Sequence, residues 1–261
     1  MSVEVSAKSY WIGYQTIVIK EVSRILRIWA QTLIPPAITM TLYFVIFGQL
    51  IGRRIGEMGG MPYMDFIVPG LIMLSVITNS YGNITSSFFG AKFGRHVEEL
   101  LISPLPPILI LAGYVTGAVF RALMVGALVL LVAAFFSDLQ IHSWSITVAV
   151  VVLTSIVFAL GGFINATFAQ KFDDISIIPT FVLQPMTYLG GVFFSVSLLP
   201  GIWETVALAN PILYMVNAFR YGMLGVTDVP LAPAFAIILG FGIVLGAICL
   251  TLLKRGTGLR T

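Results

Sequence analysis

Six long apolar blocks dominate this chain, and each is long enough to cross a lipid bilayer as a helix. An α-helix needs about 20 mostly apolar residues to span the roughly 30 Å hydrocarbon core. Inside that core the backbone satisfies its hydrogen bonds only as helices or as a closed β-barrel. The blocks are continuous rather than alternating, which favours helices. The sequence therefore predicts an all-α polytopic membrane protein with six transmembrane helices, at about residues 31–50, 64–87, 106–136, 143–168, 176–197 and 231–253.

The composition leaves no room for a soluble catalytic domain. Only 10% of the 261 residues are charged, and the mean hydropathy is +1.01. We therefore expect residues 1–261 to form a single transmembrane domain. The net charge of +3 is carried mainly at helix ends, so we interpret it as setting topology and not as a nucleic-acid surface. The single cysteine, Cys249, excludes an intrachain disulfide and a cysteine metal site.

The segment before the first span, residues 10–31, has the pattern of a helix that lies in the membrane interface. Aromatic and aliphatic residues recur at spacings of three and four, and Lys20, Arg24 and Arg27 fall together on another face. Such a helix contacts membrane lipid through its apolar face. The alternative, an amphipathic helix packed on a soluble core, lacks such a core here. Pro35-Pro36 predicts the boundary with the first span.

The basic residues of the short connections predict the orientation of the chain. The connections on one side of the membrane carry ten Lys and Arg residues and those on the other side carry three. Lys and Arg are in excess in cytoplasmic loops, so both termini are expected in the cytoplasm. The ten are Lys8, Lys20, Arg24, Arg27, Lys92, Arg95, Lys171, Lys254, Arg255 and Arg260, and the three are Arg53, Arg54 and Arg220.

Residues 195–230 are apolar enough for a seventh span but are interrupted at Pro200-Gly201 and at Asn210-Pro211. A seventh span would also move the basic C-terminal end to the outer side. We expect instead a re-entrant pair of short helices that dips into the outer leaflet and breaks at Asn210-Pro211. Arg220 lies in the second of them.

Sequence motifs for enzymatic chemistry are absent. The chain has no GxxxxGK[ST] phosphate loop, no HExxH and no GxSxG. Its two histidines, His96 and His142, are expected on opposite sides of the membrane, so they cannot share a metal ion. We therefore expect no cofactor or metal in this chain and no enzymatic activity of its own. Any ATP hydrolysis would belong to a separate subunit.

The cytoplasmic connection at residues 88–103 carries the densest polar chemistry outside the spans. Its sequence predicts a short amphipathic helix with the charges of Arg95 and Glu99 paired at i,i+4 and an apolar edge. A helix of this kind suits docking of a partner protein. A solvated linker with incidental periodicity is the alternative.

Arg121 lies well inside the third apolar block, where an arginine costs about 2.5 to 3.5 kcal/mol to insert. It either contacts an anionic substrate group or a gate, or it pairs structurally with a carboxylate or with backbone carbonyls of a neighbouring span. Asn79, Asn83 and Gln184 are further polar residues within spans, and each belongs either to the same path or to hydrogen bonds that hold the bundle together.

Two stretches carry a family resemblance, HVEELLISPLPP at 96–107 and NPILYMVNAFRYG at 210–222. Together with the order of parts, they resemble the ABC-2 family of ABC transporter permeases over essentially the whole chain. The resemblance implies a bacterial inner-membrane exporter subunit, in which two permeases, here a homodimer, pair with two cytoplasmic ATPases that bind ATP and magnesium. It implies an amphipathic, lipid-like, drug or polysaccharide substrate. It also implies that the helix near residue 98 is the coupling helix, formed by Arg95, Val97, Glu98, Glu99, Leu100 and Leu101.

Two other functions remain open. A stand-alone secondary transporter coupled to an ion gradient would need carboxylates within the membrane, and Asp65 is the only candidate near a span. No inverted repeat relates the two halves by eye. An intramembrane enzyme would need paired carboxylates, metal ligands or a nucleophile, which the sequence does not offer.

Overall fold

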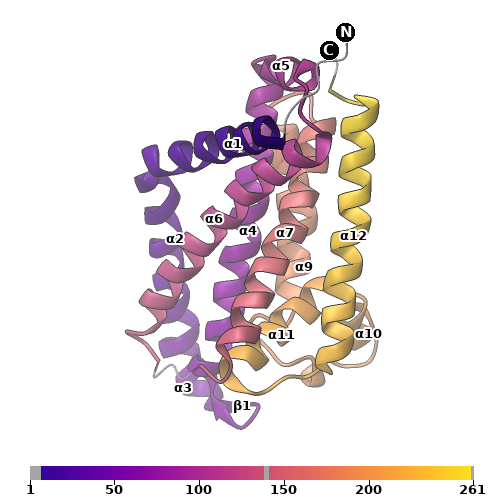
Figure 1. The fold of residues 1–261 in the computed structure, drawn as a ribbon. Coiled ribbons are helices and arrows are strands. Elements are labelled where there is room, and N and C mark those ends of the chain that lie inside the picture. The colour runs from indigo at the N-terminus through magenta and orange to yellow at the C-terminus, as the bar shows by residue number, and fades with distance from the viewer. Residues whose placement is uncertain (1–6, 138–140, 260–261) are drawn as a thin grey trace.

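The computed structural model describes residues 7–137 and 141–259, and these form a helical bundle with one small β-hairpin (Figure 1). The elements up to the hairpin are α1 (Ala7–Arg27), α2 (Trp29–Tyr43), the π-helix η1 (Phe44–Ile51), α3 (Gly52–Ile55), β1 (Glu57–Met58) and β2 (Met61–Pro62). The long helices of the bundle follow as α4 (Tyr63–Phe93), α6 (Pro107–Ala133), α7 (Trp144–Phe168) and α12 (Leu231–Arg255), with the short α5 (His96–Ile102) between α4 and α6.

The segment between α7 and α12 consists of short elements. They are α8 (Asp174–Ile178), the π-helix η2 (Pro179–Leu183), α9 (Gln184–Leu189), the 3₁₀-helix η3 (Val196–Leu198), α10 (Ile202–Leu208) and α11 (Pro211–Leu224). The predicted break at Asn210-Pro211 is present, because α10 ends at Leu208 and α11 begins at Pro211. The Oδ1 atom of Asn210 caps α11 by accepting a hydrogen bond from the backbone N–H of Ile212 at 3.0 Å.

Five helical stretches in the described part of the chain are long and apolar enough to cross a membrane. This confirms an all-α polytopic membrane protein. The five stretches are Trp29–Ile55, Tyr63–Phe93, Pro107–Ala133, Trp144–Phe168 and Leu231–Arg255.

The expected span at 176–197 is not one continuous helix. The helical path there runs without a gap from Asp174 to Leu189, with the π-helix η2 between α8 and α9, and then turns at Gly190-Gly191. Pro179 and Pro185 each remove a backbone donor, and Gly191 adopts a positive φ of 75° that ends the helix. Apolar composition alone predicted a longer helix than these residues permit.

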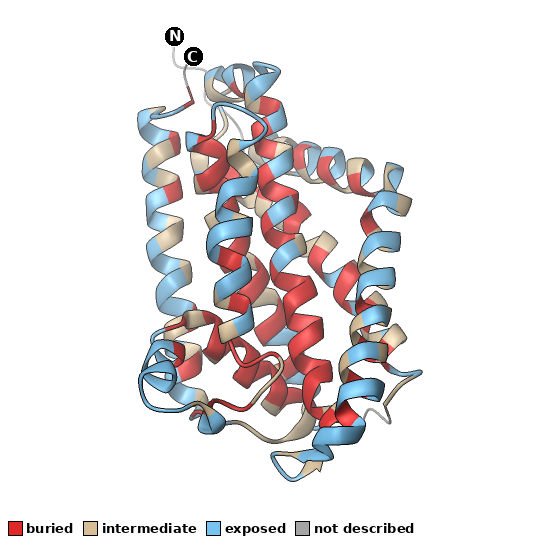
Figure 2. Ribbon diagram, turned by 180° about the vertical axis from the view of Figure 1, so that it is seen from behind, coloured by how far each residue is buried: buried red, intermediate tan, exposed pale blue. Residues whose placement is uncertain are grey.

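The bundle is built around α4, which packs mainly against α6 and α7. Within the apolar window of α4, 78% of the residues are buried, against 17% for Trp29–Ile55 and 17% for α12. Figure 2 shows the same contrast between the central helices and the exposed edge helices. The core therefore lies along α4 and α7, and α2 and α12 present apolar side chains outward.

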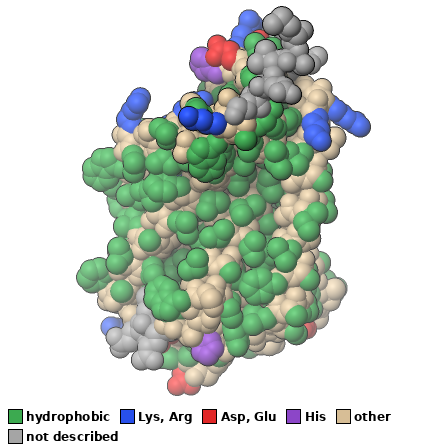
Figure 3. Space-filling model, viewed as in Figure 1, with side chains coloured by type: hydrophobic (Ala, Val, Ile, Leu, Met, Phe, Trp, Pro, Cys, Tyr) green, Lys and Arg blue, Asp and Glu red, His purple; other side chains and the backbone are tan. Residues whose placement is uncertain are grey.

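The two ends of the bundle differ. α1 lies across the bundle at the end that also holds α5 and the C-terminal end of α12, while α3, β1 and α10 lie at the opposite end (Figure 1). In the space-filling view, Lys and Arg side chains gather at the α5 end, and hydrophobic side chains cover the middle of the molecule (Figure 3). We name these the α5 end and the α10 end.

Three predicted boundaries need correction. The interfacial helix ends at Arg27, and the chain turns at Ile28 (φ −105°, ψ 31°), so residues 29–31 already belong to α2. Pro35 and Pro36 lie inside α2, and the helix continues through them although each lacks a backbone donor. The connection at 88–103 is also shorter than predicted, since α4 extends to Phe93.

Candidate functional site

The first candidate site is α5, which stands out from the α5 end of the bundle. Gly94 and Arg95 alone join it to α4, and Arg95 has a left-handed backbone with φ 60°. Val97 is buried at 2% exposure, and Leu100 and Leu101 pack beside it against a cluster that includes Ile17 and Phe88. The short amphipathic helix predicted in this connection is therefore present.

The opposite face of α5 is free for contact. Glu98 and Glu99 are exposed, and Ile102 is 83% exposed. The expected charge pair between Arg95 and Glu99 is absent from the ion pairs of the described residues, which are Arg24–Glu21 and Arg220–Asp228. The i,i+4 geometry does not exist, because Arg95 lies before the helix and not in it. The helix thus offers an acidic outer surface with one exposed isoleucine.

The second candidate site is a buried polar junction between α1 and α4. Glu21 is fully buried, and its Oε1 accepts a hydrogen bond from the Ser87 hydroxyl at 2.6 Å. Its Oε2 accepts one from Arg24 Nη2 at 2.9 Å, and the same nitrogen donates to Asn83 Oδ1 at 2.8 Å. Arg24 therefore points from the predicted basic face toward the bundle, which the sequence did not predict. Asn83 hydrogen-bonds to the N-terminal helix, which agrees with the second of its two predicted roles, a bond that holds the bundle together.

Close approach of α1 to α6 buries this junction. A Cβ on Gly117 would lie 2.6 Å from Glu21 Cβ, and a Cβ on Gly113 would lie 2.6 Å from Ile17 Cγ2. Only glycine permits such contact between the helices. Of the other predicted basic residues, Lys20 lies 5.8 Å from the centroid of the Tyr114 ring.

Arg121 has an amide partner and no carboxylate partner among the described residues. Its Nε donates to Asn79 Oδ1 at 3.3 Å, and Asn79 Nδ2 donates to the Ser75 carbonyl at 3.0 Å. Asn79 and Asn83 lie one turn apart on α4, so this pair and the Glu21 junction follow each other along one helix. Gln184 is not part of the group, because it is exposed at the start of α9.

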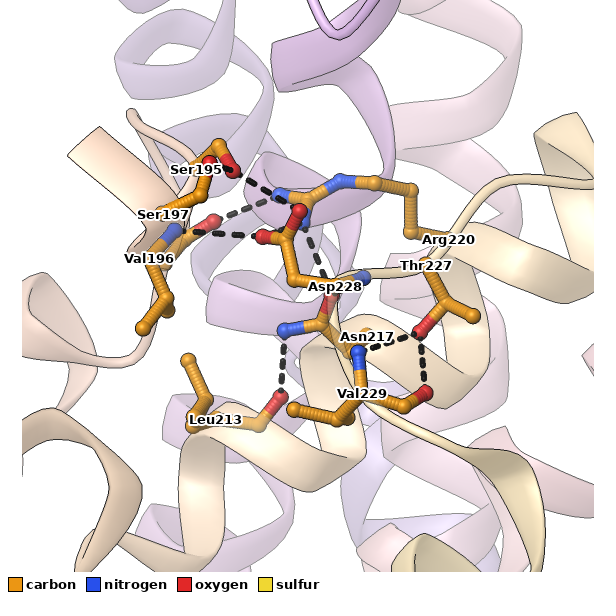
Figure 4. A network of polar contacts seen from close by, with 10 residues as sticks. Ser195, Val196, Ser197, Leu213, Asn217, Arg220, Thr227, Asp228 and Val229 are labelled. Atoms are coloured by element: carbon orange, nitrogen blue, oxygen red, sulfur yellow. Dashed lines mark hydrogen bonds and ion pairs between the residues drawn. The ribbon is translucent and has the colours of Figure 1, made fainter. Parts of the chain in front are cut away.

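The third candidate site is a polar network at the α10 end (Figure 4). Arg220 is 1% exposed, and its guanidinium lies 3.9 Å from the centroid of the Phe66 ring and 3.9 Å from Asp228 Oδ2. It also donates hydrogen bonds to the Gly191 carbonyl and, at 3.4 Å, to Asn217 Oδ1. Arg220 is therefore a buried cation in α11, toward the same end of the bundle as Arg53 and Arg54, with which the orientation count had grouped it.

Asp228 ties this network to the preceding loop. It accepts hydrogen bonds from the Ser195 hydroxyl at 2.7 Å and from the Val196 backbone N–H at 3.1 Å, while its own N–H donates to Asn217 Oδ1 at 3.0 Å. The sequence analysis missed Asp228. The available signal was a carboxylate eight residues after Arg220 in the same interrupted segment.

In residues 7–137 and 141–259, no three His, Cys, Asp or Glu side chains are grouped so that they could hold a metal ion. The three sites are an exposed amphipathic helix, a buried charge junction and a closed polar network.

The chain is similar in sequence to known membrane transport proteins. The family model described as "ABC-2 type transporter" matches residues 13–224, from within α1 to the end of α11. The chain is 56% identical to the inner membrane transport permease YadH of Escherichia coli K12 over 252 residues, which cover 97% of this chain and 98% of that protein. It is 29% identical over 185 residues to Nodulation protein J of Rhizobium leguminosarum bv. trifolii, covering 70% of this chain and 71% of that protein.

Proposed function

This chain belongs to the ABC-2 type transporter family, and on that premise we propose that it is the permease subunit of an ATP-driven exporter whose ATPase is a separate cytoplasmic protein. Family membership and the apolar helices make the chain a multi-pass membrane transport protein. ATP and magnesium would be bound by the ATPase, because the permease sequence has no phosphate-binding loop.

The α5 end is the cytoplasmic end in this proposal. It carries most of the Lys and Arg residues on which the orientation depends, and α1 and the end of α12 lie there (Figures 1 and 3). Arg260, one of the ten, lies outside the described residues. The continuous helical path through α8, η2 and α9 would make the sixth crossing. Residues 195–230 would form the re-entrant segment of the outer leaflet, with Asn210 capping its second helix.

The observation that supports the proposal is that α5 is exposed and is joined directly to α4. The helix is joined by two residues to α4, the most buried of the candidate spans, and its outer face carries Glu98, Glu99 and Ile102. A protein that bound this face would act directly on the core of the bundle. We therefore assign Arg95, Val97 and the residues up to Leu101 to coupling, with Val97 anchoring the helix and the two glutamates contacting the ATPase.

The exposed apolar edges of the bundle suit lipid and a second copy of the chain. Leu42, Leu50 and Ile243 are 54%, 64% and 72% exposed on the edge helices. In the proposed homodimer the amphipathic substrate, a lipid, drug or polysaccharide, passes between two copies or leaves sideways into the outer leaflet. Asn79 and Arg121 are the residues we assign to that path.

The test is co-purification from the native host in mild detergent, with protein identification and an ATPase assay. We expect the wild-type chain to bring down an ATPase in roughly equal amount, and Glu98→Ala/Glu99→Ala to lose it while inserting normally. The matched control is Glu57→Ala/Glu204→Ala, which removes two exposed carboxylates at the α10 end. An unchanged complex in the α5 variant would refute the docking role.

The alternative, an ion-coupled carrier, gains one observation from the structure. Glu21 is a fully buried carboxylate that was not among the predicted candidates. Asp65, the predicted candidate, accepts a hydrogen bond from the Ser137 hydroxyl at 2.5 Å. Glu21 is already paired with Arg24, which weakens its case as a site for a transported cation. A chain that purified alone, without nucleotide hydrolysis, would favour this alternative.

A further inference from the structure

A cleft of about 610 Å³ opens at the α5 end between the end of α4, the end of α7 and the turn after α12. We call it the Lys92 cleft. Two of its lining residues are cationic and none is acidic. The lining residues are Phe89, Lys92, Phe93, Arg95, Thr167, Phe168, Ala169, Gln170 and Gly258.

Lys92 is held in place at this cleft by the end of α7. Its Nζ donates to the carbonyl of Thr167 at 2.6 Å and to the carbonyl of Ala169 at 2.8 Å. An ammonium group has three donors, and the third has no partner within the described chain. No carboxylate among the described residues forms an ion pair with Lys92 or with Arg95. The cleft therefore holds a positioned cation whose charge no carboxylate neutralises.

Arg95 brings a second cation to the same cleft. It is the described non-glycine residue with a positive φ, and that left-handed backbone turns the chain sharply between α4 and α5. A strained backbone of this kind costs roughly 1–2 kcal/mol and persists where the surrounding structure fixes it. The turn holds Arg95 at the cleft beside Lys92, with both side chains at one level of the bundle.

That level is the end of the membrane-spanning helices. Lys92 lies in the last turn of α4, and Phe168 is the last residue of α7. Phe93 and Phe168 are 64% and 58% exposed beside the cations, and Phe172, 56% exposed, packs its ring 5.1 Å from that of Phe93. The cleft therefore places exposed apolar rings next to its two cations.

We propose that the Lys92 cleft binds the phosphate group of an anionic phospholipid from the adjacent leaflet. Lys92 and Arg95 contact the phosphate oxygens, and the exposed phenyl rings of Phe93 and Phe168 lie against the upper part of the acyl chains. The lipid supplies both the missing negative charge and the apolar cover, whereas a free phosphate ion would supply only the charge. Basic pockets between spans on the cytoplasmic side bind anionic headgroups by this chemistry. The inference rests on the spanning helices and not on the ATPase.

The test is calorimetric titration of the purified full chain, in neutral detergent, with dihexanoyl phosphatidylglycerol. Dihexanoyl phosphatidylcholine and inorganic phosphate are titrated in parallel. We expect saturable binding of phosphatidylglycerol only. Lys92→Gln should weaken it about five- to tenfold, which is the effect of losing one cation–phosphate contact. Lys254→Gln, which removes an exposed cation of the same end outside the cleft, is the matched control and should leave the affinity unchanged.

A second variant is needed because Lys92 also joins α4 to the end of α7, so Lys92→Gln could lose binding through misfolding. Arg95→Asn removes the other cation, and asparagine tolerates the left-handed backbone. It should weaken phosphatidylglycerol binding by a similar factor. Equal loss in Lys254→Gln would mean a diffuse basic surface and would overturn the proposal, as would inorganic phosphate binding as tightly as the lipid. If the wild-type chain binds no lipid and Lys92→Gln no longer co-purifies with the ATPase, the lipid proposal is overturned and the cleft is a contact for the ATPase.

Discussion

Replacing Glu21 by glutamine tests whether the buried junction holds α1 on the bundle. The substitution keeps the size of the side chain and can keep the hydrogen bond that the carboxylate accepts from Ser87. It removes the negative charge that faces Arg24 Nη2 at 2.9 Å and replaces it with an amide. The Arg24 guanidinium then has no counter-ion, because the side chain at position 21, which is fully buried, no longer carries a charge.

The expected loss of unfolding free energy depends on how far the Glu21 and Arg24 side chains are buried. A hydrogen bond to a charged group contributes about 1.5–3 kcal/mol, and leaving a buried charge unpaired costs more. The Arg24 side chain is 29% exposed, so solvent or headgroups recover part of the loss. We therefore expect Glu21→Gln to lower the free energy of unfolding by about 2 kcal/mol, which for a chain of this size lowers the unfolding midpoint by roughly 4–8 °C.

Cys249 makes the assay specific. It is the single cysteine of the chain and is fully buried between α12 and α7, so a thiol-reactive fluorophore labels it only when the bundle opens. Fluorescence is followed during heating of the purified protein in detergent. Arg27→Gln, which removes an exposed charge from the same helix, is the control and should leave the midpoint unchanged.

The double variant Glu21→Gln/Arg24→Gln decides between pairing and a general loss of charge. If the two residues stabilise each other, the double variant loses less stability than the sum of the single variants, by about 1 kcal/mol or more. A midpoint in Glu21→Gln equal to that of the wild type, or strictly additive losses, would refute the view that this ion pair fixes α1.

Three further predictions concern other parts of the bundle. Gly117→Ala should push α1 away from α6 and cost about 1–3 kcal/mol, whereas Gly240→Ala, where a methyl group meets open space, should be neutral or stabilising in the same thermal assay. Asp228→Asn should loosen the α10-end network and raise tryptic cleavage at its buried arginine, which the wild type resists. Backbone N–H groups of Gln170 and the next residue hold the pKa of Asp174 below its usual value, so its stabilisation of that turn is present at neutral pH and is lost as the pH falls through the lowered pKa. We expect the protection factor of these amides, which is the observed exchange rate corrected for the intrinsic rate at each pH, to fall in acid for the wild type and to stay constant in Asp174→Asn.

Features set by local sequence were predictable. Length and apolarity placed five of the spanning helices, since these depend only on the membrane thickness and the backbone's need for hydrogen bonds. The short helix at His96–Ile102 and the break before Pro211 followed from local periodicity and from proline chemistry. The Gly190-Gly191 pair could have shortened the predicted span at 176–197, because the helix ends there.

Features set by contacts distant in sequence were not predictable. Glu21 stands among basic residues in α1, and its burial depends on Ser87, 66 residues away. Arg24 was assigned with Lys20 and Arg27 to a basic face, because periodicity identifies faces but does not show which of them meets the bundle. The side-chain partners of Arg121 likewise became clear only when α4 and α6 were placed side by side.

Because α5 is joined to α4 by two residues, a movement of α5 can be transmitted along α4. A helix of 31 residues is about 46 Å long at 1.5 Å per residue, and α4 is one helix from Tyr63 to Phe93. With Gly94 and Arg95 as the whole linkage, a tilt of about 5° imposed at α5 would displace the far end by about 4 Å. That far end bears Phe66, whose ring covers the guanidinium of Arg220. A push on one side of the membrane thus reaches the polar network on the other through a single covalent element, without a relay of intervening side chains.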